Sequence, residues 1–287
     1  MQKSLPGENH VNLPESTHLE RLWSDLATKR QAALLLDYDG TLAPFQINPA
    51  EARPYPGIEP LLNRIGALPN DRLIIVSGRW LDDLRPLLKL NFQPEMWGCH
   101  GRERLLSNGQ HTLLPVREDA VSALAKADEW EDTILALGGR MERKPGSVAF
   151  HWRNLAPDHR QTLQQELRMR FATLVPANEL IWHEFDGGVE LRAGGADKGQ
   201  VVRQILAEID DAEGGYGMAY LGDDHTDEDA FAALSTRGCS ILVRATWRDT
   251  AANTWLRPPE EVIAFLTRWL EIRSRHTDTR DMDALDL

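Results

Sequence analysis

The sequence predicts an α/β fold, with a Rossmann-like core built on a parallel sheet and a separate α+β unit inserted into it. Apolar runs of strand length alternate with segments of helical spacing in both the first and the last third of the chain. Several of these runs end abruptly in charged or small polar residues, which is where open parallel sheets place their sites. The middle of the chain follows a different order of strands and helices, which indicates an insertion.

The first part of the predicted core alternates short apolar runs with amphipathic segments. Residues 32–36 are all apolar, as expected for a strand that is covered on both faces. Together with the next apolar run and the helix between them, this strand forms a β-α-β unit. The expected helices span residues 18–29, 57–68 and 80–88, and the expected strands span residues 33–37, 72–76 and 96–99.

The inserted unit is predicted over residues 112–192, where long amphipathic segments alternate with pairs of short strands. Its last two strands are joined by Asp-Gly-Gly at residues 186–188, a tight-turn sequence that predicts a hairpin. The expected helices span residues 118–137 and 158–174, and the expected strands span residues 139–143, 147–152, 181–185 and 188–191.

The helix–strand alternation of the core resumes after the insertion. Residues 260–275 close it with an apolar stripe at helical spacing. The other expected elements are helices at 197–209 and 226–234 and strands at 218–221 and 239–243. The chain therefore divides into loose tails at 1–17 and 276–287, core segments at 18–111 and 193–275, and the inserted unit at 112–192.

Composition and charge narrow the possible partners. The net charge of −12 argues against nucleic acid or an anionic membrane as a partner. Only two cysteines are present, Cys99 and Cys239, so no disulfide framework is indicated and a cytoplasmic location is expected. We expect a monomer that acts on a small molecule.

Two aspartates one residue apart, Asp37 and Asp39, follow the first predicted strand and precede a Gly-Thr turn. Asp and Gly after a strand are also ordinary turn residues, so this pair alone does not distinguish a site from a turn. Neighbouring carboxylates repel each other, however, and a divalent cation is the usual reason for holding them together.

Three further polar clusters follow predicted strands or begin a predicted helix. Ser77 and Arg79 follow the second strand, Lys198 begins a helix, and Asp223 and Asp224 follow a later strand. Each cluster has an ordinary interpretation as solvated surface or helix cap. A hydroxyl and an ammonium group nevertheless suit phosphate oxygens. Taken together, the four clusters predict a site for a cation and a phosphate group.

The order of these motifs resembles the haloacid-dehalogenase-like (HAD) phosphohydrolases. These motifs are Asp-x-Asp-Gly-Thr at 37–41, Ser-Gly-Arg at 77–79, Lys198 and Gly-Asp-Asp at 222–224. The longer run at 222–229, Gly-Asp-Asp-His-Thr-Asp-Glu-Asp, resembles the trehalose-6-phosphate phosphatase family, as do His-Gly at 100–101 and Gly-Val-Glu-Leu-Arg at 188–192. The resemblance implies a HAD core with a C2-type cap and Mg²⁺-dependent hydrolysis of trehalose 6-phosphate.

The resemblance also implies roles for the residues of the core motifs. Asp37 would attack phosphorus and form an aspartyl phosphate, and Asp39 would act first as general acid and then as general base. Mg²⁺ would be held by the side chains of Asp37 and Asp223 and by the backbone carbonyl of Asp39. Ser77, Lys198 and Thr41 would bind phosphate oxygens, and Asp224 and Arg79 would support the site.

Several residues near these motifs allow two interpretations. Arg79 either contacts substrate or pairs with an acid to orient its loop. His100 follows a strand and either binds substrate or is structural. For Asp227 we expect a helix cap rather than a role near the metal.

The inserted unit should determine substrate specificity. Arg140, Glu142 and Lys144 have the same strand parity, so one face of that strand would carry alternating charges. Such a face is often simply solvated. The resemblance implies instead that Glu142, Lys144, Arg153 and Glu190 bind sugar. Because recognition and chemistry would lie on different units, we expect the cap to close about linkers near residues 110–114 and 192–196.

Two rival functions stay open at the level of sequence. The chain could act on another sugar phosphate, as a phosphatase or a phosphomutase. It could also be a non-catalytic sugar-phosphate sensor, although Asp37 and Asp39 are both present.

Overall fold

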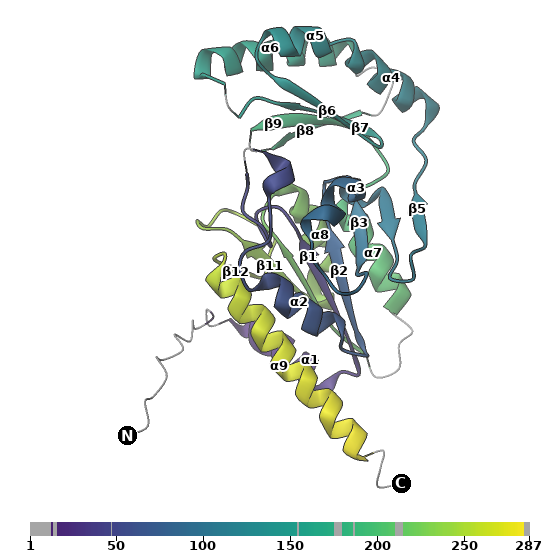
Figure 1. Cartoon of the computed structure of the whole chain (residues 1–287), viewed down its shortest axis with the longest axis vertical. Coiled ribbons are helices and arrows are strands. Elements are labelled where there is room, and N and C mark those ends of the chain that lie inside the picture. Colours follow the sequence, from purple (N-terminus) through teal and green to yellow (C-terminus); the bar gives the residue numbers. More distant parts are fainter. Residues whose placement is uncertain are drawn as a thin grey trace.

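The computed structural model describes residues 13, 16–46, 48–153, 155–174, 180–185, 187–209 and 215–283, without the side chains of residues 276–283. Two units lie one above the other (Figure 1). The lower unit is built on an eight-stranded sheet and the upper unit on a four-stranded sheet. In the described part of the chain, no helix is both long and apolar enough to span a bilayer.

The larger sheet has the strand order β12-β11-β10-β1-β2-β3-β4-β5. Every pair from β12 to β3 is parallel, and β4 and β5 continue the sheet as antiparallel strands. The strands are β1 (Gln31–Asp37), β2 (Asp71–Val76), β3 (Glu95–Gly98), β4 (Glu103–Leu105), β5 (His111–Leu113), β10 (Tyr216–Gly222), β11 (Cys239–Val243) and β12 (Thr254–Leu256).

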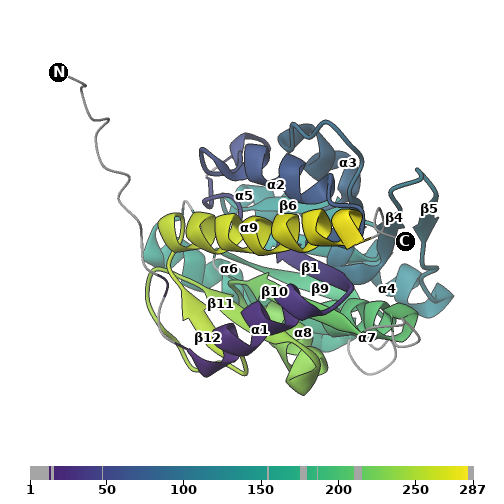
Figure 2. The ribbon, with the colours of Figure 1, turned by 90° about the horizontal axis from the view of Figure 1, so that it is seen from below.

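Helices cover both faces of this sheet, which explains the uninterrupted apolar run of β1. Leu34 and Leu36 point into the core shared with α1, α2, α3 and α9, whereas Ala33 and Leu35 point to the core shared with α7 and α8. Figure 2 shows α9 between α1 and α2, which lie with it on one face of the sheet. These helices are α1 (Thr17–Thr28), α2 (Ile58–Gly66), α3 (Leu81–Leu84), α7 (Lys198–Ile209), α8 (Glu228–Leu234) and α9 (Glu260–Asp283).

The upper unit, called the cap below, comprises the elements between Glu118 and Ala193. Its antiparallel sheet has the order β6-β7-β9-β8, and its helices pack against one face. The elements are α4 (Glu118–Asp128), α5 (Glu131–Ala136), β6 (Arg140–Lys144), β7 (Ser147–His151), α6 (Pro157–Leu174), β8 (Leu180–Phe185) and β9 (Gly188–Ala193). The other face of the sheet is turned toward the core unit (Figure 1).

Three features of the secondary structure differ from the sequence-based expectation. The helix expected over 118–137 is two helices, and Trp130 lies at their junction, where it stacks on Phe150. The helix expected over 80–88 ends at Leu84 and continues as the 3-10 turn η2 (Arg85–Leu87), because Pro86 cannot extend an α-helix. The strands β4, β5 and β12 were not expected, because each has only three residues and is too short to show a periodic pattern in the sequence.

The remaining differences concern segment boundaries. Residues 112–113, expected at the start of the inserted unit, belong to β5 of the core sheet. The C-terminal tail expected from residue 276 is wrong as far as Asp283, because α9 continues to that residue. At the other end, helix α1 begins at Thr17, and the expected tail before residue 13 lies outside the described residues.

Candidate active site

The ends of three neighbouring strands bring the predicted core residues together. In the parallel register, Leu36 of β1 pairs with Leu221 of β10, and Asp37 pairs with Val76 of β2. The residues that follow each strand therefore emerge at the same edge of the sheet. As a result Asp37, Ser77 and Asp223, far apart in sequence, line one cavity.

Lys198 lines this cavity and bridges the carboxylates of Asp37 and Asp227. Its Nζ donates hydrogen bonds to Asp37 Oδ1 and to Asp227 Oδ1, both at 2.7 Å. All three side chains are buried. Burial alone would lower the pKa of Lys198. The negative charges of Asp227 and Asp37 outweigh this effect and hold the pKa well above its ordinary value. Lys198 is thus a fixed positive charge at the site.

Asp227 supports the site through both carboxylate oxygens. Besides Lys198, its Oδ1 accepts a hydrogen bond from the Tyr220 hydroxyl at 2.7 Å. Its Oδ2 accepts from the backbone N–H groups of Asp223 and Asp224, at 3.2 and 3.0 Å. The predicted helix cap is present as a capping box of Asp224 and Asp227 at the 3-10 turn η4 (His225–Asp227), although the Asp227 side chain makes no cap bond to α8. The contact with Lys198 is an additional role that the sequence did not indicate.

Asp223 approaches Asp37 because Gly40 has no side chain. Gly40 has φ +84°, and a Cβ atom at this position would lie 2.1 Å from Asp223 Oδ2. One carboxylate oxygen from each of Asp37, Asp223 and Asp227 lies within 4.8 Å of the other two. The turn at Gly40 is therefore part of what allows the acidic cluster to form.

The cluster has the charge and the free ligand atom that a divalent cation requires. When all three carboxylates are ionised, the single ammonium group of Lys198 leaves two negative charges uncompensated. Burial, opposed by Lys198, raises the pKa of Asp37 to about 7, and burial together with the charge of Asp37 raises the pKa of Asp223 well above its usual range. Asp37 Oδ2 is buried and has no hydrogen-bond partner among the described residues. Because both oxygens of Asp227 are occupied by donors, Asp37 and Asp223 are the residues that fit a cation.

Arg79 pairs with Asp39 in a two-point contact, which is one of the two alternatives left open for Arg79. Its Nε and one terminal nitrogen donate to the two carboxylate oxygens of Asp39, each at 2.6 Å. The other terminal nitrogen donates to the backbone carbonyl of Pro49 at 2.8 Å. Asp39 is therefore held at the cavity wall by the loop that follows β2.

Ser77 lies on the cavity wall, whereas Thr41 does not. The Ser77 hydroxyl accepts a hydrogen bond from the backbone N–H of Arg79 at 3.1 Å. Thr41 is fully buried, and its hydroxyl has no partner among the described residues. Thr41 is not among the cavity residues, so the predicted phosphate contact through its hydroxyl does not fit this position, whereas a contact through its backbone N–H stays a prediction.

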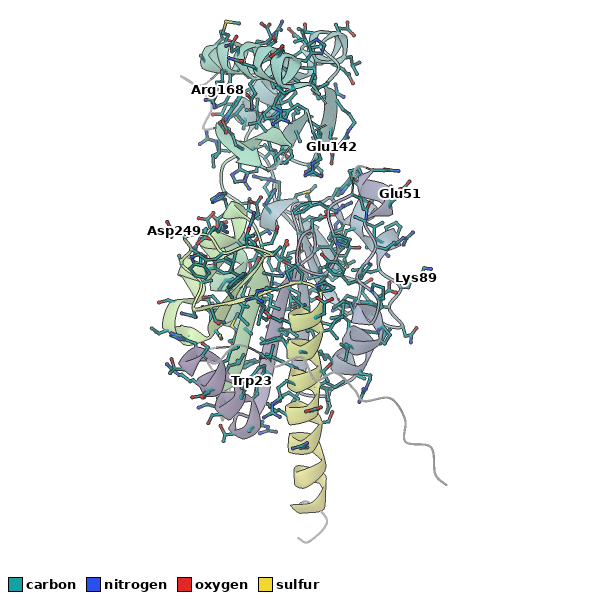
Figure 3. All side chains as sticks on the ribbon, turned by 90° about the vertical axis from the view of Figure 1, so that its left-hand side faces the viewer. Trp23, Glu51, Lys89, Glu142, Arg168 and Asp249 are labelled. Carbon is teal, nitrogen blue, oxygen red and sulfur yellow. The ribbon has the colours of Figure 1, made fainter. Side chains whose placement is uncertain are left out.

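The opposite wall of the cavity is the charged face of the cap sheet. Arg140, Glu142 and Lys144 of β6 all line it, as their shared parity predicts. Glu142 accepts hydrogen bonds from His151 at 2.9 Å and from Arg140 at 3.2 Å. Burial alone would raise the pKa of Glu142, but the contacts with His151 and Lys144 lower this pKa to about 2. Figure 3 labels Glu142 on the cap and Glu51 on the core unit below it.

Glu190 connects the cap face to the core. Its Oε1 accepts hydrogen bonds from the Ser147 hydroxyl at 2.7 Å and from Lys144 Nζ at 3.2 Å. Its Oε2 faces His100 Nε2 of the core unit at 3.1 Å. Burial alone would raise the pKa of Glu190, but the charge of Lys144 and the contact with His100 hold it well below its usual range. Glu190 is thus an ionised carboxylate with donors at both oxygens.

The two walls enclose a cavity of about 780 Å³. Its rim includes Phe45 of the core and Arg153 of the cap, whose guanidinium lies 5.4 Å from the Phe45 ring centre. A cavity of this size with charged groups on two sides suits a polar small molecule. Of the predicted site residues, only Thr41 does not line this cavity. Those that line it are Asp37, Asp39, Ser77, Arg79, Glu142, Lys144, Arg153, Glu190, Lys198, Asp223 and Asp224.

Sequence reasoning missed some of the cavity residues. His151 and His183 line the cavity but were not proposed, and Arg53 of the core was also not considered. His151 could have been found from strand pairing, since it lies opposite Arg140 in the β6–β7 register. No sequence signal indicated Arg53, because it lies in an irregular segment.

A family model described as trehalose-phosphatase matches residues 35–259 of the chain. The trehalose-phosphate phosphatase of Mycobacterium leprae is 33% identical over 272 residues, covering 89% of this chain and 61% of that protein. The trehalose-phosphate phosphatase of Mycobacterium marinum is 31% identical over 282 residues, covering 91% of this chain and 67% of that protein. The chain therefore spans about two thirds or less of the length of these relatives.

A solved structure shares the fold. The C-terminal domain of trehalose-6-phosphate phosphatase from C. albicans superposes with a TM-score of 0.74 at 21% sequence identity. The superposition covers 92% of this chain and 99% of that domain. The arrangement of a core unit with a cap above it is therefore also found in that solved structure.

Proposed function

This chain belongs to the trehalose-phosphatase family, and we propose that it hydrolyses trehalose 6-phosphate to trehalose and inorganic phosphate. The observation that carries the proposal is the position of Asp37. It lies beside a fixed ammonium group and a second buried acid, at the floor of a cavity whose far wall is a charged sheet face. Such a site can bind a phosphate at one end and sugar hydroxyls at the other.

Asp37 is the nucleophile in this proposal. Lys198 holds its Oδ1, its Oδ2 is buried without a hydrogen-bond partner among the described residues, and one of its oxygens lies within 4.8 Å of an oxygen of Asp223. Attack on phosphorus forms an aspartyl phosphate and splits one slow hydrolysis into two easier steps. Mg²⁺, when bound by Asp37 and Asp223, supplies positive charge to the phosphoryl oxygens.

Asp39 is the proposed acid and base. It lies two residues from the nucleophile, where it can protonate the leaving sugar oxygen and later take a proton from water. Because Arg79 holds both of its oxygens, that ion pair must loosen before Asp39 can carry a proton. Ser77 and Lys198 stabilise the charge that spreads over the phosphoryl oxygens.

The cap determines which phosphate ester is accepted in this proposal. Lys144, Glu142 and Arg153 offer charged groups to hydroxyls of a disaccharide, and Glu190 holds Lys144 in position. Sites that hydrogen-bond substrate hydroxyls discriminate strongly, because an analogue without them leaves buried polar groups unpaired. The presence of only two cysteines favours a cytoplasmic enzyme, and we propose that it acts as a monomer.

Release of inorganic phosphate from trehalose 6-phosphate tests the proposal directly. We expect turnover with Mg²⁺ present and its loss on adding excess chelator, because the three buried carboxylates then repel the anionic substrate. Restoring Mg²⁺ should restore the rate. A panel of other sugar phosphates serves as the control for substrate identity.

Two outcomes of this assay would contradict the proposal. Faster turnover of another sugar phosphate would assign the chain to that substrate instead. Binding of sugar phosphate without turnover of any phosphate ester would make the chain a sensor.

Replacing Glu190 with alanine should reduce kcat/KM for trehalose 6-phosphate by about 10- to 100-fold. The reason is that Lys144 and His100 lose their common partner. Hydrolysis of p-nitrophenyl phosphate, which needs no sugar contacts, should change little. Steady-state kinetics with both substrates measure the difference.

Glu184→Ala is the matched control for Glu190→Ala. Glu184 lies on the neighbouring strand β8, is exposed and pairs with Arg168. Its loss should leave both activities unchanged. Equal losses on the two substrates in Glu190→Ala would argue against the assignment of the cap to sugar recognition.

A further inference from the structure

A strained turn after β3 contacts four separate parts of the molecule. It is the 3-10 turn η3 (Cys99–Gly101), followed by Arg102, and all of these residues are buried. Cys99, His100 and Gly101 have φ values of +49°, +56° and +103°, three left-handed residues in succession. Non-glycine residues rarely adopt this conformation and keep it only where surrounding contacts enforce it, often at functional sites.

Arg102 binds both chain segments that connect the core to the cap. One terminal nitrogen donates to the carbonyl of Pro115 in the first linker at 3.2 Å. The other donates to the carbonyls of Ala193 and Gly194, where β9 ends and the second linker begins, at 2.9 and 3.0 Å. The two linkers are far apart in sequence, so a single guanidinium group joins them to each other and to the core.

Arg102 also lies against the cap hairpin. A Cβ atom on Gly146, in the turn between β6 and β7, would lie 2.5 Å from Arg102 Nε. Backbone hydrogen bonds reinforce both ends of this contact, from Leu114 N to Arg102 O and from Ala193 N to Gly146 O, each at 2.8 Å. The base of the cap is therefore packed around this one side chain.

His100, two residues earlier, contacts the cap at the site itself. Burial lowers the pKa of His100 to about 3, so its imidazole is neutral and its Nε2–H donates to the Glu190 carboxylate. Behind the ring, Gly78 leaves the necessary space, since a Cβ there would lie 2.5 Å from His100 Cε1. The turn thus holds the cap at two points, the linkers and Glu190.

The same turn holds the loop that carries Ser77 and Arg79. The backbone N–H of His100 donates to the carbonyl of Ser77 at 3.0 Å, and that of Cys99 donates to the carbonyl of Arg79 at 2.8 Å. The carbonyl between them, that of Gly78, accepts from Lys144 of the cap at 3.3 Å. Since Arg79 in turn holds Asp39, the position of the cap is connected to the acid–base group through this loop.

We propose that the turn Cys99–Gly101 and Arg102 form the docking element of the cap, in which Arg102 anchors the two linkers and His100 receives Glu190. Both are positioning residues: neither is required to touch the reacting atoms. The docking element fixes the distance between the sugar-binding face and the phosphate-binding loop, so its loss should affect substrates that span both units. The choice of substrates rests on the proposed function, whereas the docking itself does not.

Arg102→Ala tests the anchor. We expect kcat/KM for trehalose 6-phosphate to fall by about tenfold or more, because small displacements of positioning groups have effects of this size. The rate with p-nitrophenyl phosphate should change by less than about twofold. Amide hydrogen exchange should accelerate at Leu114 and Ala193, while β1 and β10 keep their protection. Exchange requires no substrate, so this measurement stands even if the chain acts on a different phosphate ester.

Arg102→Lys, Arg203→Ala and His100→Asn complete the test. Lysine keeps the positive charge, but its single ammonium group cannot donate to the carbonyls of both linkers as the forked guanidinium group does. We therefore expect Arg102→Lys to lie between the parent chain and Arg102→Ala in both measurements. Arg203 is an exposed arginine of α7 that pairs with Asp197, and its loss should change neither readout. Asparagine tolerates the left-handed backbone at residue 100 but is too short to reach Glu190. His100→Asn should reproduce the substrate-selective loss without faster exchange in the linkers.

Two results would overturn the proposal. In the first, Arg102→Ala and Arg102→Lys keep the ratio of the two activities and the exchange rates of the linkers. In the second, exchange accelerates equally in β1, β10 and the linkers, and both activities fall together. That result would show that Arg102 supports the whole fold rather than the position of the cap. If Arg102→Ala does not fold, Arg102→Lys decides between these outcomes.

Discussion

Asp37→Asn should abolish turnover, with a fall in kcat on the order of 10⁴-fold or more, as expected when a nucleophile is removed. An amide cannot form the aspartyl phosphate. The substitution keeps the shape of the side chain, and its carbonyl oxygen can still accept the hydrogen bond from Lys198. Release of inorganic phosphate measures the loss of turnover. Quenching the reaction in acid and detecting the phosphorylated chain measures the loss of the aspartyl phosphate.

The same substitution should stabilise the metal-free protein. Burial raises the folded-state pKa of Asp37 to about 7, from an ordinary value of 3.8. The folded state therefore holds this proton more tightly than the unfolded state, and stability is lost as pH rises from about 4 to 7. Asp37→Asn removes that loss. Its free energy of unfolding in chelator should exceed that of the parent chain at pH 8, and the difference should shrink toward pH 4.

Urea denaturation with and without Mg²⁺ separates the two effects of Asp37. Mg²⁺ should stabilise the parent chain more than Asp37→Asn, because the substitution removes one of the two carboxylates that fit the cation. Residual turnover above about 1% in Asp37→Asn would rule out Asp37 as the nucleophile. A stability in chelator lower than that of the parent chain at pH 8 would contradict the electrostatic description of the cluster.

Lys198→Met should have the second largest effect and should reduce both activity and stability. Removing the ammonium group leaves Asp37 and Asp227 without their shared donor in a buried site. Breaking a buried ion pair costs about 3–5 kcal/mol, and losing one donor to the transition state costs about 10²–10³ in kcat. The pKa of Lys198 lies above its ordinary value, so its stabilising contribution is complete at neutral pH and is lost only in strongly alkaline solution.

Lys126→Met is the matched control for Lys198→Met. Lys126 is exposed in the last turn of α4, and its loss should change the free energy of unfolding by less than about 0.5 kcal/mol. Urea unfolding at pH 7.5 and phosphate release measure both variants. If Lys198→Met retained the parent rate, Lys198 would be a purely structural ion-pair partner and the phosphate-binding role would be wrong.

The opposite signs expected for Asp37→Asn and Lys198→Met follow from the same imbalance of charge. Three buried carboxylates share one ammonium group, so removing an acid relieves repulsion and removing the base increases it. Proteins often retain such destabilising clusters where function requires them. The pair of variants therefore tests the charge of the site independently of which sugar phosphate is bound.

Local patterns in the sequence predict the strongly periodic elements and the polar residues at their ends. The apolar run of β1 indicates a strand buried on both faces, and the polar residues after it indicate a site at the edge of a parallel sheet. The shared parity of Arg140, Glu142 and Lys144 likewise indicates one charged face of β6. These inferences succeed because periodicity and strand ends are local properties of the chain.

Contacts between side chains of different elements could not be predicted, because they depend on how the elements pack. The pairing of Arg79 with Asp39, the contact of Asp227 with Lys198 and the binding of both linkers by Arg102 depend on strand register and helix placement. The short strands β4 and β5 also depend on neighbouring strands, since three residues cannot show a period. A sequence pattern specifies which face a residue occupies, but the distance between two faces is a property of the packed molecule.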